Sequence, residues 1–342
     1  RFQGLTLDGR NQAARGIRVD QNTSGGVEQV TFKNFQEFNT PGKIMACAFY
    51  VNGGDTYWTF DDCIFQDITG LPDGVIASGT GFSHGVYINR EFGSASGVNK
   101  PKGIYFQRCR FYRILPGEDS DAIRWTDSGW TYQDSQVSAE NCYFEDIGKR
   151  AFKASGSGGR FVNNTITNSF DGSFQATGWF DVNNYKEQYS VVSLYGRNHV
   201  VTGNKFNGGH IRHFFDTTVE AGNVELGNNI FTLSTNWGLN GTVATNSGFG
   251  TMFGSIYTSS DVKIHDNVAD AVQFGVQVFS ASTNLTLANN KFRNPVGLTT
   301  YAGIGWGRGI RLGRYGTSPP YTAGAVANTI IVGNSFDGFA GD

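Results

Sequence analysis

The 342 residues carry 27 Lys and Arg against 29 Asp and Glu, a net charge of −2, with 47 Gly, 28 Phe and only 7 Pro. This balance excludes the basic surface that nucleic-acid binding requires, and no apolar run approaches the roughly 20 residues of a membrane-spanning helix. Abundant Phe and Gly with little Pro indicate a folded all-β protein with many tight turns. We therefore expect no nucleic-acid partner and no membrane insertion.

One phrase recurs along the chain: an apolar strand, then Cys or Asn, then any residue, then Phe or another apolar residue. Its Cys or Asn stands at Cys63, Cys109, Cys142, Asn164, Asn204, Asn229, Asn267, Asn290 and Asn334. Subtracting neighbouring positions gives intervals of 22 to 46 residues. The shortest intervals fit a solenoid coil of three short strands, whereas propeller blades need about 40–45 residues. The repeat predicts an all-β, right-handed parallel β-helix (solenoid) of about 10–11 coils.

The repeated positions also predict how the interior is built. Equivalent residues of successive coils lie about 4.8 Å apart in a solenoid. A buried Asn can therefore hydrogen-bond the Asn of the next coil, and the Phe two residues later stacks on the next Phe. Cys63, Cys109 and Cys142 replace Asn in three coils. Because their spacing matches no zinc motif, we expect a stack of buried thiols rather than disulfides or metal ligands.

A second strand in each coil usually opens with Gly or another small residue and alternates apolar with polar side chains. These strands are expected at 16–19, 48–51, 85–88, 122–125, 151–154, 191–194, 212–215, 254–257, 275–278 and 309–312. With a period of two, the apolar members point into the core and the polar members point outward. The outward column then contains Arg18, Tyr87, Arg124, Lys153, Gln277 and Arg311.

The middle of this column carries side chains suited to acidic sugars. Tyr87, Arg124 and Lys153 fall in three consecutive coils, with Tyr195 and His213 in the next two. A spacing of about 4.8 Å per coil matches a polysaccharide laid on the face, where cations pair with carboxylates and aromatic rings stack on sugars. The predicted substrate-binding residues are Tyr87, Arg124, Lys153, Tyr195, Trp125 and Trp130. The alternative is a row of solvated side chains.

Three carboxylates crowd the turn that leads into the Arg124 strand: Glu118, Asp119 and Asp121. Glycoside hydrolysis uses two carboxylates, about 5–5.5 Å apart for retention of configuration or 6.5–9.5 Å for inversion. The cluster could supply such a catalytic pair within one coil. A solvated or turn-capping role is the alternative.

A second group of catalytic candidates combines His213 with Asp216, about three coils further on. A His–Asp pair is suited to acid/base chemistry near neutral pH, and His84 is a further candidate near the same face. Long insertions after the Asn/Cys-x-Phe turn should emerge from one edge and could carry a site. They are expected around 66–83, 168–188, 232–250 and 293–307.

The phrases at 4–9, 30–35 and 140–147 resemble the coils of pectate-lyase-like β-helix proteins. The irregular coil lengths look most like those of bacteriophage tailspike depolymerases. The resemblance covers the whole chain but rests on scaffold phrases, and no catalytic motif of the family matches. It implies a homotrimer, located outside the cell or on the virion surface, that binds and cleaves bacterial surface polysaccharides. It also implies that 1–342 is a single β-helix domain from a longer chain.

Three functions stay open on the sequence. The favoured one is an endo-hydrolase of an acidic polysaccharide that uses the 118–121 carboxylates. The second is a polysaccharide lyase, in which His213, Tyr87 or Lys153 is the base and Arg124 neutralises a uronate. The third is a non-catalytic adhesin or structural β-helix. No cofactor is expected, and acidic turns leave calcium open because such turns can bind it.

Overall fold

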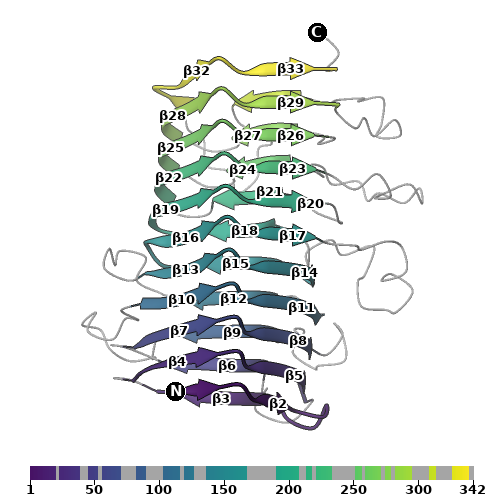
Figure 1. Cartoon of the computed structure of the whole chain (residues 1–342). Coiled ribbons are helices and arrows are strands. Elements are labelled where there is room, and N and C mark those ends of the chain that lie inside the picture. The colour runs from purple at the N-terminus through teal and green to yellow at the C-terminus, as the bar shows by residue number, and fades with distance from the viewer. Residues whose placement is uncertain are drawn as a thin grey trace.

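The computed structural model is a solenoid of stacked coils, with the two termini at opposite ends (Figure 1). Its regular elements are all β-strands within the residues that it describes. In the same residues, no helix has the length and apolarity that a membrane crossing requires. The described ranges are 1–20, 23–38, 45–52, 56–70, 82–89, 103–115, 119–126, 136–167, 190–207, 213–217, 221–232, 251–255, 259–270, 274–278, 282–294, 308–312 and 326–338.

The strands form three parallel sheets, called sheets A, B and C below. Sheet A contains β1 (Phe2–Gln3), β4 (Ser24–Glu28), β7 (Tyr57–Asp61), β10 (Gly103–Gln107), β13 (Val137–Glu140), β16 (Gly159–Val162), β19 (Arg197–Thr202), β22 (Ala221–Gly227), β25 (Ser259–His265), β28 (Ser282–Ala288), β31 (Val326–Ala327) and β32 (Ile330–Val332). Sheet B contains β2 (Thr6–Asp8), β5 (Thr31–Gln36), β8 (Ile64–Thr69), β11 (Arg110–Leu115), β14 (Tyr143–Ile147), β17 (Thr165–Thr167), β20 (Lys205–Asn207), β23 (Ile230–Thr232), β26 (Val268–Asp270), β29 (Lys291–Arg293) and β33 (Ser335–Asp337). Sheet C contains β3 (Arg15–Val19), β6 (Ala46–Asn52), β9 (Phe82–Asn89), β12 (Asp119–Thr126), β15 (Arg150–Ala154), β18 (Ser190–Leu194), β21 (His213–Thr217), β24 (Thr251–Ser255), β27 (Phe274–Val278) and β30 (Arg308–Leu312).

Each coil contributes successive strands to the three sheets, so that hydrogen-bonded neighbours are usually three strands apart in sequence. This connectivity defines a parallel β-helix, and parallel crossovers of this kind are right-handed. The 11 strands of sheet B agree with the predicted number of coils. The all-β, right-handed parallel β-helix prediction is confirmed.

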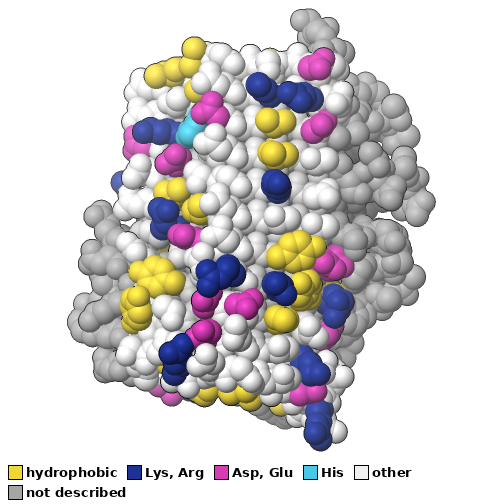
Figure 2. Space-filling view, viewed as in Figure 1, with side chains coloured by type: hydrophobic (Ala, Val, Ile, Leu, Met, Phe, Trp, Pro, Cys, Tyr) yellow, Lys and Arg dark blue, Asp and Glu magenta, His cyan; other side chains and the backbone are white. Residues whose placement is uncertain are grey.

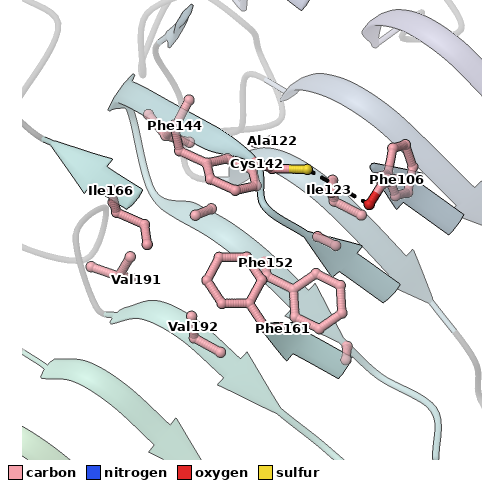
Figure 3. Packing of buried hydrophobic residues seen from close by; sticks show 14 of the residues in the cluster. Phe106, Ala122, Ile123, Cys142, Phe144, Phe152, Phe161, Ile166, Val191 and Val192 are labelled. Carbon is pink, nitrogen blue, oxygen red and sulfur yellow. Dashed lines mark hydrogen bonds between the residues drawn. The ribbon is translucent and has the colours of Figure 1, made fainter. Parts of the chain in front are cut away.

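Columns of stacked phenylalanines form much of the core. Phe32, Phe65, Phe111 and Phe144 stack across four coils of sheet B, with ring centroids 5.0, 4.7 and 4.8 Å apart. All four are fully buried. Figure 3 shows Phe144 packed among other core side chains from neighbouring strands. Stacked rings at this separation add to the stability that burial alone provides.

The predicted amide ladder runs through the turn between sheets A and B. The first five Asn side chains each donate to the Asn Oδ1 of the next coil over 2.9–3.1 Å, and all six donate to a carbonyl oxygen of sheet A. The ladder comprises Asn164, Asn204, Asn229, Asn267, Asn290 and Asn334. The interior amides are thereby paired on both sides, as buried polar groups must be.

The predicted stack of thiols continues this ladder toward the N-terminus. Cys63, Cys109 and Cys142 are buried and free. Their Sγ atoms lie 3.4–3.7 Å from the sheet A carbonyl oxygens of Val27, Phe60 and Phe106 (the last contact is dashed in Figure 3). The thiols therefore donate to the same column of carbonyls as the asparagine amides. Cysteine therefore keeps the contact with this column of carbonyls.

One predicted insertion begins too early. Residues 66–69 belong to β8 and residues 82–83 to β9, because the apolar side chains Phe65 and Ile68 keep the strand in the core beyond the turn. The remaining residues of the predicted insertions lie mainly outside the described residues. These are 71–81, 168–188, 233–250 and 295–307.

Candidate functional site

Sheet C presents two rows of outward side chains instead of one. In β12, Asp121 pairs with His84 and Arg150, and Ile123 pairs with its own partners, but Ala122 between them has no ladder pair. Ala122 and Ile123 both belong to the core (Figure 3). Two inward residues in succession interrupt the usual alternation of a strand. The outward positions of β12 are consequently three residues apart, at Asp121 and Arg124.

In the first five coils a small residue occupies the interruption, whereas Val191, Phe214 and Met252 stand there in the next three. A Cβ atom on Gly85 would lie 2.6 Å from the carbonyl oxygen of Ala122 and 2.9 Å from Cδ1 of Phe111. The column is occupied by Gly16, Ala48, Gly85, Ala122 and Ala151 in the first five coils. The small residue that opens the predicted strand in these five coils therefore marks this close approach.

The first row, called the Tyr-Arg-Lys row, places Tyr87, Arg124 and Lys153 directly opposite one another on β9, β12 and β15. This confirms their predicted alignment in three consecutive coils. The complete row is Arg18, Tyr50, Tyr87, Arg124, Lys153, Ser193, Asp216, Gly254, Gln277 and Arg311.

Two members of the predicted column lie elsewhere. Ser193 and Asp216 occupy the positions expected for Tyr195 and His213. Tyr195 follows the end of β18, where its backbone N–H donates to the carbonyl oxygen of Ala154 over 2.8 Å. The placement of Tyr195 in the substrate-binding row was wrong, because Ser193 is the residue in register with Lys153 and Tyr195 lies two residues further on, past the end of β18.

The second row, called the His-Asp row, lies beside the first. Cys47, His84, Asp121 and Arg150 are consecutive in register on β6, β9, β12 and β15, and all four side chains are buried. His213 belongs to this row further along, opposite Ser190 and Thr251.

Tyr87 is part of an ordered stack of rings and guanidinium groups. Its ring lies 5.4 Å from that of Tyr50 at an interplanar angle of 13°. Arg124 is placed over Tyr87, and Arg15 over Tyr50, at 5.4 and 4.8 Å from the ring centroids. These cation–π contacts orient the arginines. Because neighbours on both sides of the row cover its ring faces, Tyr87 presents an edge and a hydroxyl, and the predicted stacking of a sugar on its face is wrong.

Asp121 is the counter-ion of two arginines. Its side chain is 0 % exposed, and its Oδ1 accepts a hydrogen bond from Arg150 Nη1 over 3.3 Å. Arg124 Nη1 lies 4.0 Å from Asp121 Oδ2, and Arg150 Nε donates to Ser193 Oγ over 2.8 Å. A buried carboxylate between guanidinium groups stabilises their positions. This arrangement does not suit the predicted hydrolytic role, which needs access to a water molecule or a glycosidic oxygen.

The second predicted hydrolytic partner is not among the described side chains. Glu118 lies outside the described residues, and of Asp119, His213 and Asp216 the structure describes only the backbone. No predicted carboxylate pair can thus be assigned within the described part of the chain.

The two predicted tryptophans have different outcomes. Trp125 is 0 % exposed and belongs to the core, so its predicted contact with substrate was wrong. It directly follows Arg124, and regular alternation in the second half of the strand turns it inward. Trp130 lies outside the described residues.

Cys47 and Tyr50 remain neutral near neutral pH. Burial raises the pKa of the Cys47 thiol to about 12, and the Sγ atom donates to the carbonyl oxygen of Phe49 over 3.1 Å. Burial also raises the pKa of Tyr50, whose hydroxyl accepts from Asn89 Nδ2 over 3.0 Å. A nucleophilic thiolate at Cys47 is therefore disfavoured, and the group serves as packing beneath the row.

Tyr50 and Arg150 lie in the two rows but are not among the predicted site residues. Tyr50 was within a predicted strand and was passed over, while Arg150 immediately precedes the small residue Ala151. His84 and Asp121 stand at the same position, one residue before Gly85 and Ala122. In each of these coils, the residue directly before the small residue points outward. The sequence therefore did contain a signal for Arg150.

Among the side chains that the structure describes in these rows, cations outnumber carboxylates between β9 and β15. These side chains include the cations Arg124, Arg150 and Lys153 and the carboxylate Asp121. Lys153 is only 9 % exposed. Charges shielded from water interact more strongly than charges in bulk solvent. The described face is therefore suited to an anion. In the described residues, no group of three or more His, Cys, Asp or Glu could hold a metal ion.

Comparisons with known proteins give distant structural likenesses, of which two are described here. No family model and no curated protein matches the chain. The Dettilon tailspike protein gp208 is 10 % identical over 92 % of this chain, with a TM-score of 0.32. The A-module of the mannuronan C-5 epimerase AlgE6 from Azotobacter vinelandii is 10 % identical over 94 % of this chain and 91 % of its own, with a TM-score of 0.29. The present chain spans 57 % of the tailspike's length. At these scores the likenesses carry no argument about function.

Proposed function

We propose that this chain is a carbohydrate-active β-helix that binds an acidic polysaccharide over the Tyr-Arg-Lys row and cleaves it by β-elimination. The observation that carries the proposal is the register of Tyr87, Arg124 and Lys153 on three consecutive strands. Arg124 is held between the Tyr87 ring and Asp121, 5.4 Å from the ring centroid and 4.0 Å from the carboxylate oxygen.

Binding follows from the spacing of the cations. Arg124 and Lys153 are neighbours across one sheet ladder, so their backbones are about 4.8 Å apart. A guanidinium group recognises a carboxylate with two parallel hydrogen bonds, and an ammonium group adds a compact charge beside it. A polymer that carries uronate carboxylates supplies both partners.

The cationic site favours β-elimination over hydrolysis. The base removes the proton from C5 of a uronate, and the released electron pair forms the C4–C5 double bond while the C4–O4 bond breaks. The O4 oxygen leaves with its electron pair and takes up a proton. Arg124 stabilises the negative charge that develops on the carboxyl group during this step. Tyr87 and Lys153 flank Arg124 on its two sides, and they are the candidates for the base.

The test uses a panel of acidic capsule polysaccharides and exopolysaccharides, with chain length followed by gel filtration and unsaturated products by ultraviolet absorbance. Shortening with new absorbance is the expected result, and it should disappear in Arg124→Ala. Arg18→Ala is the matched control, since Arg18 lies in the same row but at its N-terminal end, paired with Asp20.

Other outcomes would select the other functions. Shortening without absorbance would indicate hydrolysis and direct attention to Glu118 and Asp119. Binding without shortening across the panel would indicate an adhesin. The homotrimer and the extracellular or virion-surface location stay predictions of the family resemblance.

A further inference from the structure

Sheet A carries an exposed pair of tyrosines away from the Tyr-Arg-Lys row. Tyr57 begins β7 and is 47 % exposed, and Tyr105 lies in the next strand, β10. Their ring centroids are 5.5 Å apart and their planes are inclined at 54°. Figure 2 shows a hydrophobic patch on this side, at the height of β7 and β10 in Figure 1. The two rings form an angled aromatic surface.

Tyr105 is fixed against the sheet. A Cβ atom on Gly103 would lie 2.5 Å from Tyr105 Cε2 and 2.8 Å from its hydroxyl oxygen. The ring therefore folds back over the glycine, and only the missing side chain leaves room for it. The hydroxyl donates to Gln136 Oε1 over 3.0 Å. Both ends of the Tyr105 side chain are held, so the surface is preorganised for a ligand.

The tyrosine pair belongs to the same coils as the proposed site. β7 and β9 lie in one coil and β10 and β12 in the next, so Tyr57 shares a coil with Tyr87 and Tyr105 shares one with Arg124. Tyr57 and Gly103 begin their strands. They therefore stand at the edge of sheet A that the chain reaches after it leaves sheet C.

We infer that Tyr57 and Tyr105 form a second carbohydrate site, which takes a pyranose ring of the same acidic polysaccharide beyond the part bound on sheet C. The inference rests on the proposed function. The apolar C–H face of a pyranose fits an aromatic ring, and the sugar hydroxyls stay in water around it. A protein partner is less well matched, because a stable interface needs about 800 Å² per partner and two rings supply only a small part of that area.

The polymer would therefore leave the Tyr-Arg-Lys row, which runs along the solenoid axis, and continue around the solenoid at the level of the coils that contain β7 and β10. A short oligosaccharide can occupy the sheet C site alone, whereas a longer one reaches Tyr57 as well. The second contact then adds affinity only above a threshold length, as expected when two sites engage one chain.

The experiment measures the dissociation constant of a length series, from disaccharides to dodecasaccharides, by calorimetry. Tyr57→Ala should weaken binding of the long oligosaccharides about 3- to 10-fold and leave the short ones unchanged. Tyr57→Trp should retain the affinity of the wild-type chain. Ile230→Ala is the matched control, because Ile230 is another large exposed apolar side chain, 43 % exposed, and lies on sheet B.

The outcomes separate this inference from the proposed function. If no polysaccharide of the panel binds the wild-type chain, or if Arg124→Ala binds all of them normally, the proposed function fails and this inference with it. If the polymer binds through Arg124 but Tyr57→Ala matches Ile230→Ala at every length, only the second site is refuted. Equal weakening at all lengths would also refute it, since that result places Tyr57 beside the first site.

Discussion

Replacing Asn229 by Ala removes one rung of the buried amide ladder. The Asn229 side chain donates to Val201 O and Asn267 Oδ1 and accepts from the backbone N–H and the amide of Asn204, all over 2.9–3.0 Å. Truncation deprives the Val201 carbonyl and two N–H groups of Asn204 of this partner. Each unpaired buried group costs about 1–3 kcal/mol, so the free energy of unfolding should fall by about 3–5 kcal/mol if a water molecule compensates in part.

Chemical denaturation of the variant, followed by circular dichroism, measures this loss as a shift of the unfolding midpoint. Asn229→Cys should lose less, because a thiol donates to the equivalent carbonyl at Cys142. The control is Asn223→Gly, which removes one exposed hydrogen bond to Asn198 at a residue with φ of 49°, and should change the stability by only about 0.5 kcal/mol. An Asn229→Ala midpoint equal to that of Asn223→Gly would refute the stabilising role of the ladder.

Three further predictions concern charge and burial. Arg124→Ala and Lys153→Ala should each weaken binding of an acidic oligosaccharide by at least about tenfold in calorimetry; unchanged affinity would contradict the cationic site. Burial lowers the pKa of His199 to about 4. The free energy of unfolding should therefore keep the full contribution of this residue above about pH 6.5 and fall by about 3 kcal/mol toward pH 4, because the unfolded state takes up a proton there. A His199→Gln variant whose free energy of unfolding falls equally steeply with acid would count against this. Burial raises the pKa of Cys109, so its thiol should resist alkylation in the folded chain and react after denaturation, as mass spectrometry can show; rapid labelling of the folded chain would disprove its burial.

The fold could be predicted because one local phrase recurs in nearly every coil. The Asn and Cys positions that define the phrase form the ladder, and Asn204 and Cys109 occupy equivalent places in it. In a solenoid, equivalent residues of adjacent coils are in contact. Aligning the repeats therefore predicts which residues are neighbours in the folded chain. The sequence therefore contained the long-range contacts of the core.

The site was predicted less completely because strict alternation does not hold in sheet C. A period of two brought Tyr87, Arg124 and Lys153 together correctly, since each lies in the regular half of its strand. The same rule missed Arg150, which lies beyond the interrupted pair, and it placed Tyr195 in the row. It also could not show that the carboxylate of Asp121 is buried between arginines. That property depends on three neighbouring coils at once.

The two rows of sheet C form a layer of polar contacts outside the hydrophobic core. In β9, His84 and Tyr87 bracket the core-facing Gly85 and Val86. Many members of the rows are buried and paired across coils, as Asp121 is with Arg150. Two such positions per coil, repeated over ten strands, allow many combinations of side chains on one scaffold. A combinatorial library that varies partners in neighbouring coils together should therefore yield more folded proteins than one that varies each position alone.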